Sequence, residues 1–188
     1  MKILLIDFYD SFTYNLKHYL ELDGREVFVI RHDHIGDINY LNSFSHIILS
    51  PGPGMPLDKK NMSEIISFCE GHIPLLGICL GMQAIGLHLG GTLENMSNVM
   101  HGVNRTVRVD NSKAILFSGL PNEFKVGLYH SWALSDLNTK YIDARLHNGC
   151  VMAISDPSRK LFGLQFHPES ILSEFGKEIL SNFLVFKY

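Results

Sequence analysis

The sequence lacks several features that would place it in a specialised class. Its formal net charge is only −3 and charged residues make up 19%, so it has no basic surface typical of nucleic-acid binding. No apolar run approaches the roughly 20 residues that a membrane-spanning helix needs. The short apolar start of the chain meets Asp7 at once, which is unlike a secretory signal. We therefore expect a cytoplasmic protein that binds neither nucleic acid nor membrane.

Cysteine is also scarce. The chain has three cysteines, Cys69, Cys79 and Cys150, and they are widely spaced. An odd number without close spacing argues against a disulfide framework and against a cysteine-based zinc site. A reactive thiol remains open as a role for one of them, and the surrounding sequence has to indicate which.

The bulk composition is that of an ordinary globular protein. The chain has 188 residues, of which 46% are hydrophobic. That length supports one domain with a sizeable core and is short for two. We expect a single domain over residues 1–188.

The pattern of apolar residues changes about half-way along the chain. Up to about residue 95, short apolar runs alternate with segments that carry apolar residues at helical spacing, which predicts a parallel sheet covered by helices on both faces. The predicted strands are 2–7, 26–30, 46–49 and 73–78, and the predicted helices are 11–22, 62–69 and 81–89. After residue 92 the runs are strand-like, with few helical patterns between them. These strands are 103–109, 124–129, 141–147, 151–154 and 161–166, followed by a helix over 173–186. The fold class is thus α/β, with three layers, a mainly parallel central sheet and an antiparallel β extension in the C-terminal half.

Cys79 lies in the most informative segment. A predicted strand runs into it, a predicted helix begins just after it, and Gly77 and Gly81 stand two residues to either side. This spacing is typical of a nucleophile elbow, a sharp strand-to-helix turn that presents a reactive side chain above the sheet. The positive end of the helix favours a thiolate there. The alternative is that Cys79 is a buried core cysteine, the commonest fate of a free cysteine. The flanking glycines alone do not decide between a nucleophile and a core residue.

His167 and Glu169 are the candidate base and its partner. His167 ends an apolar strand, and Pro168 stiffens the link to Glu169. In an extended chain, residues two apart point the same way, and a carboxylate beside an imidazole stabilises the imidazolium. The sequence contains ten histidines, so a chance pair at a strand end is the competing interpretation. His101 and His130 are rival bases, but neither has a carboxylate beside it in sequence, and at most they shape the site.

A rigid loop follows the predicted strand 46–49. Pro51-Gly52-Pro53-Gly54 places two glycines between prolines, so that backbone N–H groups can face a ligand without obstruction. Near a nucleophile, such groups stabilise an oxyanion. A simple tight turn is the alternative. The loop lacks the lysine and the spacing of a phosphate-binding loop, which excludes nucleotide binding of that kind.

Taken together, three motifs carry a family resemblance over the whole chain. They are Pro51-Gly-Pro-Gly54, Gly77-Ile-Cys-Leu-Gly81 with Gln83, and Gln165-Phe-His-Pro-Glu169. In this order they resemble the class I, triad-type glutamine amidotransferases. The start, Asp7-Phe-Tyr-Asp-Ser-Phe-Thr-Tyr-Asn15, and the stretch from Gln165 to Glu174 resemble one branch, the small subunits of anthranilate synthase and of aminodeoxychorismate synthase.

The resemblance implies a role for each matched residue. Cys79 would attack the glutamine carboxamide and form a glutamyl thioester, with His167 as its base and Glu169 orienting that base. Backbone N–H groups of Gly52 and Leu80 would form the oxyanion hole. The positions that match the binding of the substrate's amino-acid end or backbone are Gly52, Gly54, Gln83, Ser131 and Trp132. The resemblance implies a larger chorismate-binding synthase as partner, and no metal or organic cofactor.

Two positions depart from the branch. Met82 stands where histidine is usual after Cys-Leu-Gly, and Trp132 replaces the leucine of Tyr-His-Ser-Leu. If position 132 acts through its backbone, the chemistry tolerates the exchange. The resemblance assigns Tyr9 and the Asp-Ser-Phe motif to subunit contact, whereas capping of the following helix by Ser11 is the simpler explanation.

Three functions remain to be separated. The leading hypothesis is the glutaminase subunit of anthranilate synthase, with the aminodeoxychorismate enzyme as its near alternative. A stand-alone cysteine hydrolase of γ-glutamyl bonds would need no partner. A catalytically idle regulatory subunit would have no need of Cys79, His167 and Glu169 together.

Overall fold

The structure, a computed structural model, describes residues 1–22 and 24–186. Within these residues, one sheet of nine strands has the order β2-β1-β3-β4-β9-β8-β7-β5-β6. The first five strands in this order pair in parallel and the remaining pairings are antiparallel. The predicted α/β class, with its antiparallel extension, is confirmed.

The parallel strands are β1 (Lys2–Asp7), β2 (Glu26–Arg31), β3 (His46–Leu49), β4 (Leu75–Ile78) and β9 (Leu161–Leu164). The antiparallel strands are β5 (Thr92–Val109), β6 (Glu123–Ser135), β7 (Ile142–Leu146) and β8 (Val151–Asp156). The helices are α1 (Thr13–Glu21), α2 (Met62–Cys69), α3 (Leu80–His88) and α4 (Gly176–Val185). Short 3₁₀ turns join several of these elements.

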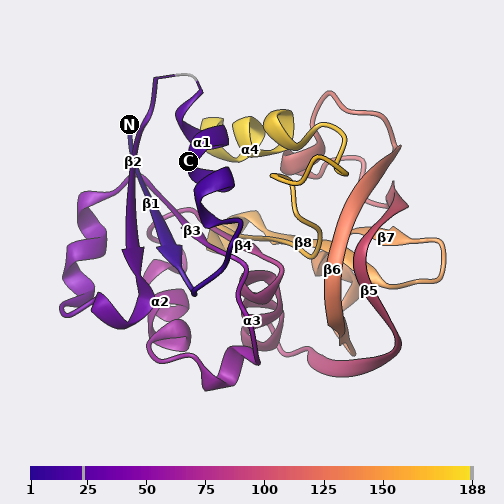
Figure 1. The fold of residues 1–188 in the computed structure, drawn as a ribbon, viewed down its shortest axis with the longest axis horizontal. Coiled ribbons are helices and arrows are strands. Elements are labelled where there is room, and N and C mark those ends of the chain that lie inside the picture. Colours follow the sequence, from indigo (N-terminus) through magenta and orange to yellow (C-terminus); the bar gives the residue numbers. More distant parts are fainter. Residues whose placement is uncertain (23, 187–188) are drawn as a thin grey trace.

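Helices cover both faces of the parallel half (Figure 1). Successive residues of β1 point to opposite faces, so Ile3 and Leu5 join one apolar cluster while Leu4 and Ile6 join the other. The first cluster takes in the inner faces of α1 and α4, and the second takes in those of α2 and α3. Burial on both faces explains why these strands are continuously apolar in sequence. Within the described residues, no helix is long and apolar enough to cross a membrane.

The main difference from the predicted elements lies in β5, which begins at Thr92 rather than at residue 103. Most of the side chains between 92 and 102 are exposed, and several are polar. A strand without a buried face has no alternation of apolar and polar residues, so the pattern on which strand prediction rests is missing. This long hairpin of β5 and β6 stands at the far end of the sheet from β2 (Figure 1).

β4 and α3 approach so closely that only glycine fits between them. A Cβ at Gly77 would overlap the carbonyl of Gly81 and lie 2.6 Å from the amide nitrogen of Met82. A Cβ at Gly81 would lie 2.8 Å from the Cβ of Leu49 on β3. These obstacles are mainly backbone, which cannot move aside as a flexible side chain can, so the two glycines fix how the helix leaves the strand.

We expect Gly77→Ala to lower the free energy of unfolding by at least about 2 kcal/mol, because the added methyl forces β4 and α3 apart. Gly36→Ala is the matched control, since a Cβ there meets nothing within 4 Å. Its effect should stay within about 0.5 kcal/mol. Chemical denaturation of both variants measures the difference, and equal stabilities would contradict the packing described above.

Candidate active site

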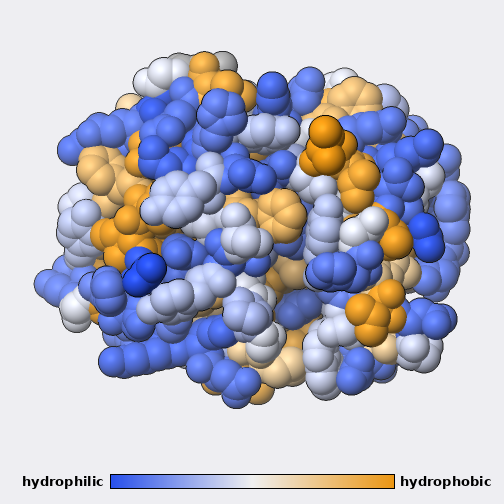
Figure 2. Space-filling model, viewed as in Figure 1, coloured by the Kyte–Doolittle hydropathy of each residue, from blue (hydrophilic) through white to orange (hydrophobic). Residues whose placement is uncertain are grey.

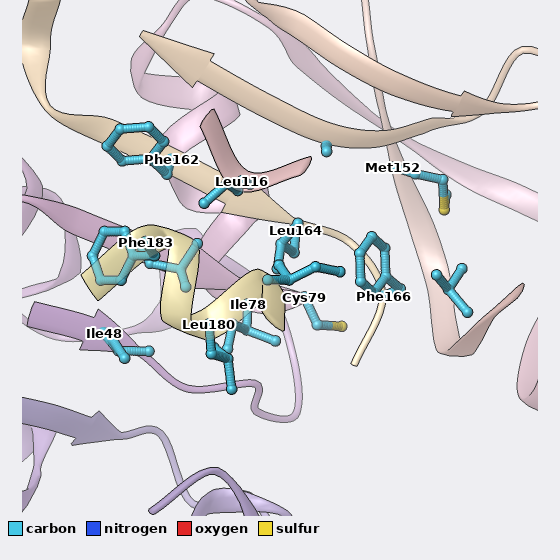
Figure 3. Packing of buried hydrophobic residues seen from close by; sticks show 14 of the residues in the cluster. Ile48, Ile78, Cys79, Leu116, Met152, Phe162, Leu164, Phe166, Leu180 and Phe183 are labelled. Atoms are coloured by element: carbon cyan, nitrogen blue, oxygen red, sulfur yellow. The ribbon is translucent and has the colours of Figure 1, made fainter. Parts of the chain in front are cut away.

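Cys79 occupies the turn between β4 and α3, where the sequence predicts it. Its backbone has φ 50° and ψ −99°, a region that a residue with a side chain rarely adopts. Such a conformation costs about 1–3 kcal/mol and persists only where the surroundings enforce it. The Cys79 amide donates to the carbonyl of Leu164 on β9 at 2.7 Å, and Gly77 and Gly81 allow the sharp exit. Figure 3 shows Cys79 beside Ile78 and Phe166 in the packed core cluster.

The other two cysteines have surroundings that suppress reactivity. Burial raises the pKa of the Cys69 thiol to about 12 and that of the Cys150 thiol to about 11. A thiol with so high a pKa holds almost no thiolate at neutral pH, and the thiolate is the nucleophile. The electrostatics therefore favour a structural role for both cysteines.

His167 and Glu169 are in contact, as the sequence predicts. Nδ1 of His167 lies 2.7 Å from Oε1 of Glu169, and both side chains are almost fully buried. The reason differs from the one expected, however. Residues 168 and 169 form a turn, closed by a hydrogen bond from the Ser170 amide to the His167 carbonyl at 3.2 Å, and are not extended. The turn brings the carboxylate back to the imidazole.

The other ring nitrogen of His167, Nε2, makes no hydrogen bond within the described part of the chain. Burial by itself would lower the pKa of His167, but the nearby Cys79 thiol and the Glu169 carboxylate raise it to about 10. The ring therefore holds a proton at neutral pH once the thiol has given one up. This is the electrostatic state that a cysteine nucleophile requires of its base.

Neighbouring groups hold the orientation of the His167 ring. The rings of Phe12 and Tyr129 both meet it edge-on, with centroids 5.6 and 4.9 Å away. The His167 amide donates to the carbonyl of Gly127 at 3.1 Å, and the Ser173 hydroxyl donates to the His167 carbonyl at 2.6 Å. Position and rotation of the imidazole are thus fixed from several sides.

The Pro51–Gly54 loop lies against the start of α3. A Cβ at Gly52 would come within 3.0 Å of the Leu80 side chain and within 2.7 Å of the Phe8 carbonyl. The buried Ser50 hydroxyl anchors the loop, because it accepts from the Phe8 amide at 2.9 Å and donates to the Pro51 carbonyl at 2.6 Å. Leu80 is the first helical residue, whose N–H has no acceptor within the helix. The two residues expected to form the oxyanion hole are therefore neighbours. Gly54 sits at the exposed end of the loop with φ 80°.

A chain of amides links the nucleophile to β6. Nε2 of Gln165 lies 3.5 Å from Sγ of Cys79. Nε2 of Gln83 donates to the Gln165 side-chain oxygen at 3.2 Å and to the Trp132 carbonyl at 3.0 Å. Gln83 is thus buried and holds backbone in place, while Ser131 and Trp132 are partly exposed beside it.

Sequence reasoning missed Gln165, Phe12 and Tyr129 as parts of this site. Gln165 stands two residues before His167, so the same period of two that linked His167 with Glu169 could have found it. No local pattern identifies Phe12 or Tyr129, because they reach His167 from the residue before α1 and from β6. Ser11 does not cap α1, which was the alternative explanation of this motif: the residue before α1 is Phe12, and the Asp10 carboxylate accepts from its amide at 2.8 Å.

Both departures from the branch pattern have a structural explanation. Met82 is fully buried and packs where a Cβ on Gly163 of β9 would stand, so it fills core space beneath the sheet. At position 132 the carbonyl is the group that accepts from Gln83. This contact therefore does not depend on the side chain at position 132.

Of the rival bases, His101 is exposed and meets the Tyr129 ring edge-on at 5.6 Å.

Within the described residues, no group of three or more His, Cys, Asp or Glu side chains is arranged to hold a metal ion. What the arrangement offers instead is a thiol at a strained turn, a buried imidazole–carboxylate pair and backbone N–H groups beside the thiol. These are the parts of an acyl-transfer site that works through a covalent thioester.

The comparison with known proteins assigns the class. The family model for glutamine amidotransferase class-I matches residues 4–186. The chain belongs to this family and is a glutamine amidotransferase. It is 41% identical to anthranilate synthase component 2 of Pyropia yezoensis, over 97% of this chain and 98% of the relative. It is 39% identical to the pyocyanine-specific anthranilate synthase component 2 of Pseudomonas aeruginosa, over 98% of this chain and 94% of the relative.

Solved structures agree with this assignment. A Thermoplasma acidophilum protein described as a GMP synthase subunit superposes with a TM-score of 0.87 at 26% identity, over 98% of this chain and 92% of that one. The arrangement of sheet and helices is therefore shared with other members of the family.

We expect Glu169→Gln to lower the pKa of His167 by about one to three pH units, because the amide removes the charge that favours the imidazolium. NMR titration of the labelled imidazole measures this value. Glu70→Gln is the control, since Glu70 contacts a different histidine, His88, at 2.9 Å near the surface. An unchanged His167 titration in the Glu169 variant would contradict the assigned electrostatics.

Proposed function

We propose that this chain is the glutaminase subunit of anthranilate synthase, acting as one domain over residues 1–188. It would hydrolyse glutamine to glutamate through Cys79 and deliver the ammonia to a larger, chorismate-using synthase subunit. The observation that carries the proposal is the buried His167–Glu169 pair beside a thiol held at a strained turn. The names of the relatives favour anthranilate synthase over the aminodeoxychorismate enzyme. A cytoplasmic location stays a prediction.

The reaction would begin with the Cys79 thiol passing its proton to Nε2 of His167. The sulfur then forms a bond to the carboxamide carbon of glutamine, and the oxygen becomes an oxyanion beside the N–H groups of Gly52 and Leu80. His167 returns the proton to the leaving nitrogen as the carbon–nitrogen bond breaks, which gives ammonia and a glutamyl thioester. Glu169 stabilises the imidazolium in between.

The second half of the reaction would use the same residues in reverse. His167 takes a proton from water, the resulting oxygen nucleophile attacks the thioester carbonyl, and the proton passes to the departing Cys79 sulfur. Glutamate leaves and the free thiol is restored. Each proton that His167 accepts is therefore handed on, and no external oxidant or cofactor enters the balance.

The closed site supports dependence on a partner. Cys79 is only 8% exposed and His167 only 3%, so substrate entry calls for some opening. Sites of this kind are commonly completed by conformational change. Exposed apolar residues also stand on the segments that follow the parallel strands: Tyr9 comes after β1, Leu57 after β3 and Ile171 after β9. Figure 2 shows apolar residues in separate groups on the viewed face, among mostly hydrophilic ones.

We expect Cys79→Ser to reduce glutamine-dependent anthranilate formation by about a thousandfold or more, because the hydroxyl is a far weaker nucleophile at this site. Anthranilate formation from added ammonia should be unchanged, since the synthase subunit does that step. Both rates are measured on the reconstituted complex. Cys150→Ser is the matched control and should keep the glutamine-dependent rate. Full glutamine turnover by Cys79→Ser would overturn the proposal.

We expect Ile171→Lys to weaken binding of the synthase subunit about tenfold or more, because it places a charge on a 96% exposed apolar position near the site. Leu22→Lys is the control: Leu22 precedes β2 and so lies at the opposite edge of the sheet. Binding is measured by titration calorimetry. Equal affinities of the two variants for the synthase subunit would show that Ile171 does not contact that subunit. Full glutamine turnover by the isolated chain would favour a stand-alone hydrolase.

A further inference from the structure

The strand that borders the active site is irregular at Ser131. Trp132 of β6 pairs with Asn95 of β5, and His130 pairs with Met100, so residues 96–99 of β5 stand opposite Ser131 alone. A bulge of this kind interrupts the ladder and frees backbone groups for other contacts. The extra residues lie on β5, and on the β6 side regular pairing stops at Trp132, so the backbone between Trp132 and His130 depends on other contacts.

Two side chains supply that support at the Trp132 carbonyl. Nε2 of Gln83 donates to this oxygen at 3.0 Å, and Nδ1 of His130 lies 2.9 Å from it. A carbonyl oxygen only accepts hydrogen bonds, so the second contact requires the hydrogen of His130 to be on Nδ1. Together the two donors use both lone pairs of the oxygen.

His130 is suited to this task and not to that of a base. It is 5% exposed, and its Nε2 has no hydrogen-bond partner within the described residues. Burial lowers the pKa of His130, and the neighbouring His167 lowers it further, while the hydrogen bond to Trp132 opposes both effects. A neutral ring with its hydrogen committed to a carbonyl acts as a fixed donor.

We propose that His130 is a positioning residue for glutamine: with Gln83 it holds the main chain of β6 at 131–132, opposite the bulge in β5, and the amino-acid end of the substrate binds against this main chain. The inference rests on the proposed function, in which Ser131 and Trp132 contact that end of glutamine. It assigns His130 an effect on substrate affinity that is separate from the chemistry at Cys79.

The test uses two alkylating reagents on the full chain with its synthase subunit present. The diazoketone analogue of glutamine carries the amino-acid end, whereas iodoacetamide does not. For His130→Ala we expect the concentration of diazoketone at half-maximal inactivation to rise about tenfold, as for a lost hydrogen bond that fixes the binding backbone. The maximal inactivation rate and the rate with iodoacetamide should stay unchanged.

Conservative variants separate positioning from a loss of folding. Asparagine can place an amide nitrogen where Nδ1 of histidine stands, whereas glutamine extends further, towards the position of Nε2. We therefore expect His130→Asn to restore near wild-type affinity for the diazoketone and His130→Gln to resemble His130→Ala. This pair decides the question even if the alanine variant does not fold.

Each remaining outcome contradicts a different statement. A fall in maximal inactivation rate with unchanged affinity would make His130 part of the chemistry and overturn its positioning role. Equal behaviour of His130→Asn and His130→Gln would overturn the role assigned to Nδ1. If the diazoketone does not label Cys79 in the wild-type chain, the proposed function itself fails, and the inference with it.

Discussion

The contact between β4 and the first turn of α3 determines where every other part of the site has to be. Because Gly77 and Gly81 lack side chains, the helix leaves the strand at a distance that no other residue allows. The turn between them forces Cys79 into a backbone conformation that costs about 1–3 kcal/mol. This conformation places the Cys79 sulfur at the end of the sheet, next to the first N–H groups of α3. The Pro51–Gly54 loop and the β9–α4 segment are then positioned relative to that point.

The electrostatics of the site depend on burial. In water, the His167–Glu169 contact would contribute little, because solvent screens exposed ion pairs. Here both side chains are almost completely buried, and the carboxylate and the thiol raise the pKa of the imidazole although burial opposes this. Burial also raises the pKa values of Cys69 and Cys150. Cys79 is buried too, so its contact with His167, and not its exposure, distinguishes it from these two cysteines.

Much of this arrangement could be predicted from the sequence because it is encoded locally. The apolar strands of the parallel half and the paired glycines around Cys79 are patterns within a few residues of each other. What could not be predicted depends on contacts between distant segments. Phe12, just before α1, and Tyr129 of β6 both reach His167 from distant parts of the sequence. The early part of β5 has no buried face, so no apolar pattern marks it as a strand. The His167–Glu169 contact was predicted correctly but for a different backbone geometry, since a turn and not an extended chain brings the two together.

The central claim is that Cys79 carries the glutamyl group during the reaction. The most direct measurement is rapid acid quenching of the chain, mixed with glutamine and the synthase subunit, followed by mass spectrometry of the peptide that contains Cys79. We expect a glutamyl adduct on Cys79 that disappears as glutamate accumulates. Glutamate formation without any adduct on Cys79, or with the glutamyl group on another residue, would contradict the claim.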